Sequence, residues 1–258
     1  MKTKAGGQRG AVVVAGASAG FGPQVTRVLA ERGFTVIALV RRGAQPAGLA
    51  RNTPDRCVIP VAVDVGDRAA LDRALKNVPA DCPEVVALVN NAGLSRGFGP
   101  LHGADPRHWR DLIDPNLRGL FNVTAAVVPG LVEQGHGHVV TIGSIAAEYP
   151  VPGSTGCGPT RTFVQRLNLG LSADLEGSGV RVSCIAPGPP GALLSHVQFD
   201  GAPDHLPDGV EALAAGDVAE AVARCLTLPV RLTDDLGPLA HPTKEALDRD
   251  RMRTQSHS

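Results

Sequence analysis

Short apolar runs rich in valine and isoleucine alternate along this chain with longer stretches of amphipathic, helical character. Such runs are typical of strands that are buried on both faces, as in a parallel sheet whose two sides are covered by helices. The apolar runs are residues 11–15, 36–40, 58–65, 85–89, 139–142 and 180–185. Strands and helices in alternation are joined by right-handed crossovers. The sequence therefore predicts an α/β fold built on a doubly wound parallel sheet.

Composition limits the number of domains and the classes of partner. A chain of 258 residues that is 43% hydrophobic and has no low-complexity linker fits one domain, residues 1–258. With 25 basic and 25 acidic residues, the charge gives no case for binding nucleic acid. The chain has no apolar stretch long enough to span a membrane and no apolar signal region, which predicts a cytoplasmic protein without membrane contact. The five cysteines form no closely spaced pair, so neither a disulfide framework nor a metal site is predicted.

A glycine-rich turn follows the first apolar run directly and leads into a helical pattern. Its candidate cofactor-binding residues are Gly16, Ser18, Gly20, Phe21 and Gly22. Glycines there allow a tight turn and a close approach of the backbone to a pyrophosphate, whose charge a helix amino terminus favours. An ordinary strand-to-helix turn is the alternative interpretation. The position of the turn after the first strand favours a Rossmann-type dinucleotide site.

Two arginines, Arg41 and Arg42, follow the second apolar run, where sites that prefer NAD place an acid for the ribose hydroxyl. Guanidinium groups suit the 2′-phosphate of NADP(H) instead. The predicted cofactor is therefore NADP(H), although two arginines after a strand also fit a solvated turn.

Several motifs in order along the chain resemble the short-chain dehydrogenase/reductase family. They are Gly16-x3-Gly20-x-Gly22, Asp64-Val65, Asn90-Asn91-Ala92-Gly93, Asn116 in Pro115-Asn116-Leu117-Arg118-Gly119, Ser144 and Pro187-Gly188. The resemblance covers about residues 10 to 230. The stretch from Ile142 to Val164 and the segments after it are most similar to NADP-dependent 3-hydroxy acid and serine dehydrogenases.

The resemblance implies a role for each matching residue. Arg41 and Arg42 would bind the 2′-phosphate, and Asp64 and Val65 the adenine. The adenosine ribose and the central sheet would be held by Asn91, Ala92 and Gly93. Pro187 and Gly188 would contact the cofactor and open a substrate loop over about residues 187–209. Ser144 would polarise a substrate oxygen, and Asn116 would hold a water in a proton relay. Relatives commonly pair through the helices that carry Asn116 and Arg161, which implies a homodimer or homotetramer.

The chain departs from the family pattern at three positions. Ala15 stands where the family has a threonine that tethers the glycine-rich turn. Thirteen residues after Ser144, where the family has its tyrosine proton donor, stands Cys157, and one helical turn later Arg161 replaces the lysine. Arg161 keeps a positive charge and hydrogen bonds for the nicotinamide ribose. The sulfur of Cys157 stops roughly 3 to 4 Å short of a phenol oxygen, too far for direct proton transfer.

Two interpretations of Cys157 follow: a thiolate nucleophile, or a small residue that widens the pocket. Tyr149, five residues after Ser144, is the only tyrosine and a candidate to reach a substrate oxygen, with packing against the pocket wall as the alternative. Glu148 precedes it, and His196 lies in the predicted substrate loop. Histidine is an acid near neutral pH, but a single loop histidine is usually only solvated.

Three functions fit these residues. The first is an NADP(H)-dependent oxidoreductase that acts on a small carbonyl or alcohol substrate, as in specialised metabolism, with Ser144, Asn116, water and Tyr149 managing the proton. The second is a redox-neutral cyclase, dehydratase or isomerase on the same scaffold, because the usual tyrosine and lysine are both absent. The third is a non-catalytic NADP(H)-binding protein. The fold alone does not decide among them.

Overall fold

The computed structural model describes residues 9–41, 43, 57–91, 101–103, 110, 112–148, 155, 157–188 and 213–228. The strands are β1 (Ala11–Ala15), β2 (Thr35–Val40), β3 (Val58–Ala62), β4 (Val85–Asn90), β5 (Gly137–Ile142) and β6 (Val180–Ile185). The helices are α1 (Gly22–Glu31), α3 (Arg68–Lys76), α5 (Leu120–Gln134), α6 (Cys157–Asp174) and α8 (Ala215–Thr227). Three short segments complete the description: the 3-10 turns η1 (Leu101–Gly103) and η3 (Ile145–Ala147), and the π-helical turn η2 (Asp114–Gly119).

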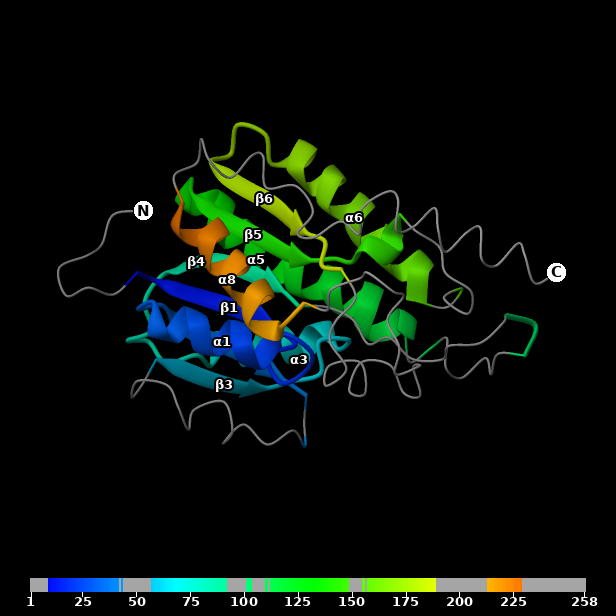
Figure 1. Ribbon diagram of the computed structural model, residues 1–258. Helices are drawn as coiled ribbons and strands as arrows, with labels where there is room; N and C mark the ends of the chain where they lie inside the picture. Colours follow the sequence, from blue (N-terminus) through cyan, green and yellow to red (C-terminus); the bar gives the residue numbers. More distant parts are fainter. Residues whose placement is uncertain are drawn as a thin grey trace.

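The six strands form one parallel sheet in the order β3-β2-β1-β4-β5-β6 (Figure 1). The predicted α/β fold of Rossmann type is therefore confirmed. Each of the six predicted strands is present, although the third ends at Ala62 rather than Val65. The strand order changes direction between β1 and β4, and in such sheets ligands bind at this point, beyond the carboxyl ends of the strands.

Both faces of the sheet are covered by helices, which explains the near-continuous apolar strands. α1 and α8 lie together on one face of the sheet, whereas α3 and α5 cover the other (Figure 1). Alternate residues of β1 serve the two faces: Val12 and Val14 pack toward α1 and α8, and Val13 packs toward α3 and α5. Full burial of each such side chain stabilises the fold by about 1.5–3 kcal/mol.

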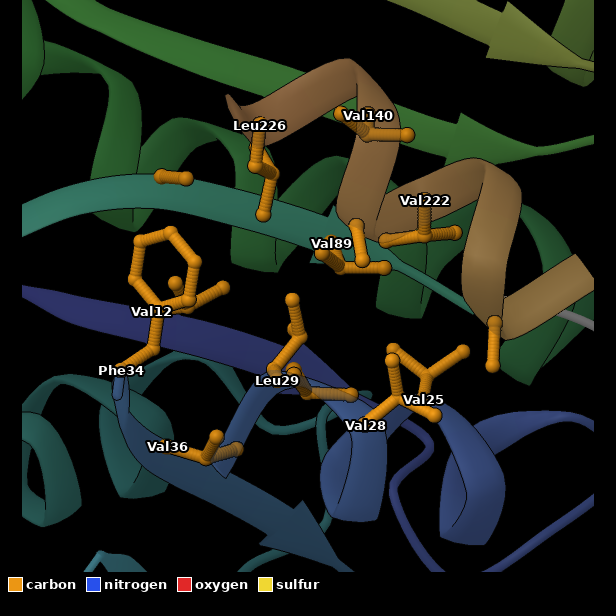
Figure 2. Close-up of a cluster of buried hydrophobic side chains, with 14 of the residues drawn as sticks. Val12, Val25, Val28, Leu29, Phe34, Val36, Val89, Val140, Val222 and Leu226 are labelled. Carbon is orange, nitrogen blue, oxygen red and sulfur yellow. The ribbon is translucent and has the colours of Figure 1, made fainter. Parts of the chain in front are cut away.

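The core between α1, α8 and the sheet is made almost entirely of aliphatic side chains. Figure 2 shows side chains from α1, α8, four strands and the turn before β2 meeting in this layer: Val12, Val25, Val28, Leu29, Phe34, Val36, Val89, Val140, Val222 and Leu226. The layer fixes the start of α1 against the end of β1. It thereby holds the glycine-rich turn between them.

Strand β3 pairs with β2 and stands at one end of the described sheet. The N–H of Val63 donates to the carbonyl of Val40 over 2.9 Å. Successive N–H groups of a strand point to opposite sides, so the nitrogen of Pro60 faces away from β2.

Within the described ranges, no helix is long and apolar enough to cross a bilayer.

Candidate active site

The glycine-rich turn lies at the carboxyl end of β1 and adopts conformations that only glycine tolerates well. Gly16 and Gly20 have φ angles of +70° and +54°. A β-carbon on Gly22 would lie 2.1 Å from the carbonyl oxygen of Gly16, so the first residue of α1 cannot carry a side chain without moving the turn. The side chain of Phe21 is 4% exposed and packs in the core, so that only its backbone lies on the turn.

Asn91, at the end of β4, fixes the orientation of this turn. Its Nδ2 donates to the carbonyl oxygens of Gly16 and Ala19 over 2.8 and 2.9 Å. Both carbonyls are thereby directed toward β4. Among the described residues, the N–H groups of Ser18, Gly20 and Phe21 have no backbone acceptor. Free N–H groups at the start of a helix are the donors that a pyrophosphate requires.

The backbone of Asn91 also bonds to the end of β1. Its own N–H donates to the carbonyl of Ala15 over 3.2 Å. This bond continues the parallel pairing of β4 with β1 to the start of the glycine-rich turn. This contact was not foreseen, because the resemblance assigned Asn91 to the ribose and the central sheet.

Two predicted cofactor residues lie beyond the ends of β2 and β3. Arg41 is exposed directly after β2. Asp64 is exposed after β3, and its Oδ1 accepts the N–H of Gly66 over 2.8 Å, whereas Val65 is half-buried. Because β2 and β3 pair in parallel, Arg41 and the Asp64–Val65 pair leave the sheet at the same edge.

Asn116 is buried in the π-helical turn η2, with 1% of its surface exposed. Single π-helical turns are rare and are frequent at functional sites. Its Nδ2 donates to Oγ1 of Thr160 on α6 over 3.2 Å. Thr160 was not among the predicted residues, because the two positions are 44 residues apart and only the packing of η2 on α6 brings them together.

Ser144 follows β5 in extended conformation and is half-buried. Its Oγ accepts the N–H of Ala146 over 3.2 Å, which leaves the hydroxyl hydrogen available as a donor. The N–H of Ile145 donates to the carbonyl of Pro187 over 3.1 Å. Ser144 and the buried Pro187 and Gly188 therefore stand side by side beyond β5 and β6.

Helix α6 is attached to the segment after Ser144 by two hydrogen bonds. Oγ1 of Thr162 donates to the carbonyl of Ala147 over 3.0 Å, and Nε2 of Gln165 donates to Oε1 of Glu148 over 2.8 Å. Cys157 is the first residue of α6, and Arg161, one turn later, is 6% exposed. The structure thus brings α6, η3 and η2 together around one edge of the sheet.

A second cysteine, Cys184 on β6, lies beneath this edge. A β-carbon on Gly143 would lie 3.1 Å from its Sγ. Burial raises the pKa of the Cys184 thiol to about 11. The thiol therefore stays protonated at neutral pH and offers no nucleophile beside Ser144.

Several of the predicted site residues are not described by the structure. Arg42, Ala92, Gly93, Tyr149, His196 and most of the substrate loop lie outside the described residues, as does the side chain of Cys157. Within the described part of the chain, no three histidine, cysteine or acidic side chains are grouped to hold a metal ion.

Known proteins match nearly the whole chain. A family model for the short chain dehydrogenases matches residues 10–196. The NADP-dependent 3-hydroxy acid dehydrogenase YdfG of Escherichia coli K12 is 40% identical over 225 residues, which are 86% of this chain and 90% of that protein. Sulfoacetaldehyde reductase 2 of Chromohalobacter salexigens is 36% identical over 249 residues, 93% of this chain and 98% of that protein. The solved closed form of a serine dehydrogenase complexed with NADP+ has a TM-score of 0.76 and 36% identity, and the match covers 86% of this chain and 91% of that one.

The matched segment includes the glycine-rich turn, Asn91, the π-helical turn with Asn116, Ser144 and all of α6. The sheet order and the positions of these residues at its carboxyl edge agree with that match. The chain belongs to the short-chain dehydrogenase family.

Proposed function

We propose that this protein is an NADP(H)-dependent oxidoreductase that interconverts a small carbonyl compound and its alcohol, with hydroxy acids and short oxo acids or aldehydes as the substrate class. The observation that carries the proposal is the glycine-rich turn, whose carbonyls are held by Asn91 and whose N–H groups are left for a pyrophosphate. Relatives with 36–40% identity over most of the chain are named for NADP-dependent hydroxy acid oxidation or for sulfoacetaldehyde reduction.

The proposal assigns cofactor-binding roles to residues at or near the carboxyl edge of the sheet. The N–H groups of Ser18, Gly20 and Phe21 and the amino terminus of α1 hold the pyrophosphate. Arg41, exposed after β2, binds the 2′-phosphate together with Arg42. Asp64 and Val65 form the adenine wall. Bound NADPH supplies the hydride.

The side chains at the other end of the site orient the substrate and manage the proton. Ser144 donates a hydrogen bond to the substrate oxygen, since its hydroxyl hydrogen is not used within the turn. Asn116, held by Thr160, positions a water for the proton relay. Arg161 keeps a positive charge on α6 where relatives of this family carry a lysine, and it lowers the energy of an alkoxide nearby.

The replacement of the usual tyrosine by Cys157 favours a second candidate function. A redox-neutral cyclase, dehydratase or isomerase needs the dinucleotide scaffold and Ser144 but no phenol that donates to a reduced carbonyl. Cys157 is then a residue that widens the pocket. A site of this atypical kind suits specialised metabolism, in which pockets are often adapted to unusual substrates.

We also propose that the protein is a cytoplasmic homodimer or homotetramer. Phe121 on α5 and Leu169 on α6 are 56% and 58% exposed, and Ile113 beside η2 is 39% exposed. Large apolar side chains that are exposed on helices favour association with a second copy.

The test is NADPH consumption, followed at 340 nm, with a panel of short 3-oxo acids, 2-amino-3-oxo acids and aldehydes that includes sulfoacetaldehyde. Consumption with any member supports the oxidoreductase. Turnover of a substrate without net change in NADPH supports the redox-neutral candidate, and NADPH binding with neither activity supports a non-catalytic protein.

The double variant Cys157→Tyr/Arg161→Lys is expected to gain reductase activity. A loss of native turnover in that variant would show that the pocket serves other chemistry.

A further inference from the structure

The loop that follows β3 carries the proposed adenine wall and has few bonds of its own. Oδ1 of Asp64 accepts the N–H of Gly66 over 2.8 Å, and the carbonyl of Asp64 accepts the N–H of Asp67 over 3.1 Å. Both bonds close turns within the loop and do not attach it to the rest of the protein. The placement of Val65 relative to the sheet therefore depends on contacts made from elsewhere.

Those contacts come from the start of α5. Nδ2 of Asn122 donates to the carbonyl oxygens of Val65 and Gly66 over 2.9 and 3.1 Å, across more than 50 residues of sequence. An amide nitrogen has two hydrogens, so this pair of bonds uses its whole donor capacity. The two carbonyls face α5 as a result, and the loop is held from the side away from solvent.

A glycine one turn earlier lets the loop approach the helix closely. A β-carbon on Gly119 would lie 2.7 Å from Cγ2 of Val65, a distance that no real side chain accepts without displacement. Gly119 ends the π-helical turn that carries Asn116. The turn η2 and the helix α5 that follows it directly thus form one segment. This segment carries Asn116 at one end of the candidate site and contacts Val65 at the other.

We propose that Asn122 is a positioning residue for the adenosine half of the cofactor. It fixes Val65 and Gly66 so that the loop, together with Arg41 at the end of the paired strand β2, receives adenosine carrying a 2′-phosphate. Asn122 itself contacts only the protein. The inference rests on the proposed function, because it concerns the affinity for NADP(H).

The experiment measures the dissociation constants of NADPH and of 2′,5′-ADP, the adenosine half alone, by isothermal titration calorimetry. Asn122→Ala is expected to raise both constants about tenfold, since two hydrogen bonds that fix the loop are lost. The matched control is Asn168→Ala, which removes an amide that donates to the carbonyl of Val164 within α6 over 2.8 Å. The control is expected to lose stability but to bind 2′,5′-ADP as the wild type does.

A second variant tests the same loop without touching Asn122. Gly119→Ala pushes Val65 away from the helix and is expected to weaken 2′,5′-ADP binding. Gly119→Ala also keeps the test decisive if Asn122→Ala does not fold.

The outcomes separate the two proposals. Wild-type protein that binds neither NADPH nor 2′,5′-ADP would overturn the proposed function and this inference with it. Wild-type protein that binds both, with Asn122→Ala and Gly119→Ala within twofold of its constants, would overturn the inference alone. Equal weakening in Asn122→Ala and Asn168→Ala would do the same, because it would show a general loss of structure.

Discussion

Glycines in this chain divide into two kinds according to what a β-carbon would meet. Gly22, at the start of α1, has the carbonyl oxygen of Gly16 at 2.1 Å from that position, and backbone atoms cannot move aside cheaply. Gly170, exposed within α6, has nothing within 4 Å. The same substitution is therefore expected to have opposite effects at the two residues.

Gly22→Ala is expected to destabilise the protein by about 2–3 kcal/mol and to abolish NADPH binding, because the phosphate turn must shift. Gly170→Ala is expected to stabilise it by about 0.5–1 kcal/mol through the better helix propensity of alanine. Urea denaturation of both variants measures the difference. Effects of the same sign would contradict the close packing at Gly22.

His138 on β5 is buried in its neutral form. It is 2% exposed, and its Nε2 lies 2.8 Å from Oγ of Ser183 on β6. Burial, with the charge of Arg181 adding to it, lowers the pKa of His138 to about 3. The unfolded chain, with a pKa near 6.5, binds a proton that the folded chain refuses between those two values.

Stability is therefore expected to fall as pH drops from about 6.5 toward about 3, and His138 alone should account for about 2 kcal/mol between pH 7.5 and pH 5. In His138→Gln this part of the pH dependence should disappear, while the part due to carboxylates remains. Urea midpoints of both proteins across this range provide the measurement. Parallel curves for the two proteins would exclude a buried neutral histidine.

At the scale of elements, α6 and η3 act as one unit because side chains of the helix reach the turn. The hydroxyl of Thr162 and the amide of Gln165 connect the helix that bears Arg161 to the segment that follows Ser144. Thr227 offers a contrast, since its hydroxyl donates to the carbonyl of Ala223 within its own helix over 2.8 Å.

Thr162→Val is expected to cost about 1 kcal/mol and to speed amide hydrogen exchange in residues 145–148 about fivefold. Any carbonyl turnover should fall, with the affinity for NADPH unchanged. Thr227→Val is expected to cost a similar amount of stability without faster exchange in that turn. Unchanged exchange in Thr162→Val would mean that Gln165 and backbone bonds alone fix η3.

For the whole molecule, the exposed side chains of Phe121 and Leu169 predict association. Phe121→Lys/Leu169→Lys is expected to lower the molar mass found by light scattering to that of a single chain of about 26.6 kDa. Arg224 is exposed on α8, on the other side of the sheet, and serves as the control. Arg224→Glu is expected to leave the molar mass of the wild-type protein unchanged. A wild-type protein that is already monomeric would contradict the proposal.

The fold could be predicted because its signals are local. Each apolar run predicted a strand that is present in the structure. The order of the motifs along the chain predicted that Gly16, Asn116 and Ser144 lie at one edge of the sheet. The ends were less certain: the third run continues in Val63 and Val65, but the Asp64 turn to Gly66 ends the strand at Ala62.

The contacts between side chains could not be predicted, because they join residues that only the folded sheet brings together. The Asn91 amide on the turn and the Asn116 bond to Thr160 span 72 to 75 and 44 residues. The π-helical form of η2 likewise has no local signal beyond Pro115. The predicted roles of all the site residues stay predictions. Those of Arg42, Ala92, Gly93, Tyr149 and His196 concern residues outside the described part of the chain, and the side chain of Cys157 lies outside it as well.

The nitrogen of Pro60 faces outward from β3, which ends the sheet as far as the described residues form it, and any other residue there would present a donor. A foreign strand that tried to add there would meet a gap in its hydrogen-bond ladder. We therefore expect β3 to add foreign strands less readily than an edge strand without proline, even when the protein is concentrated.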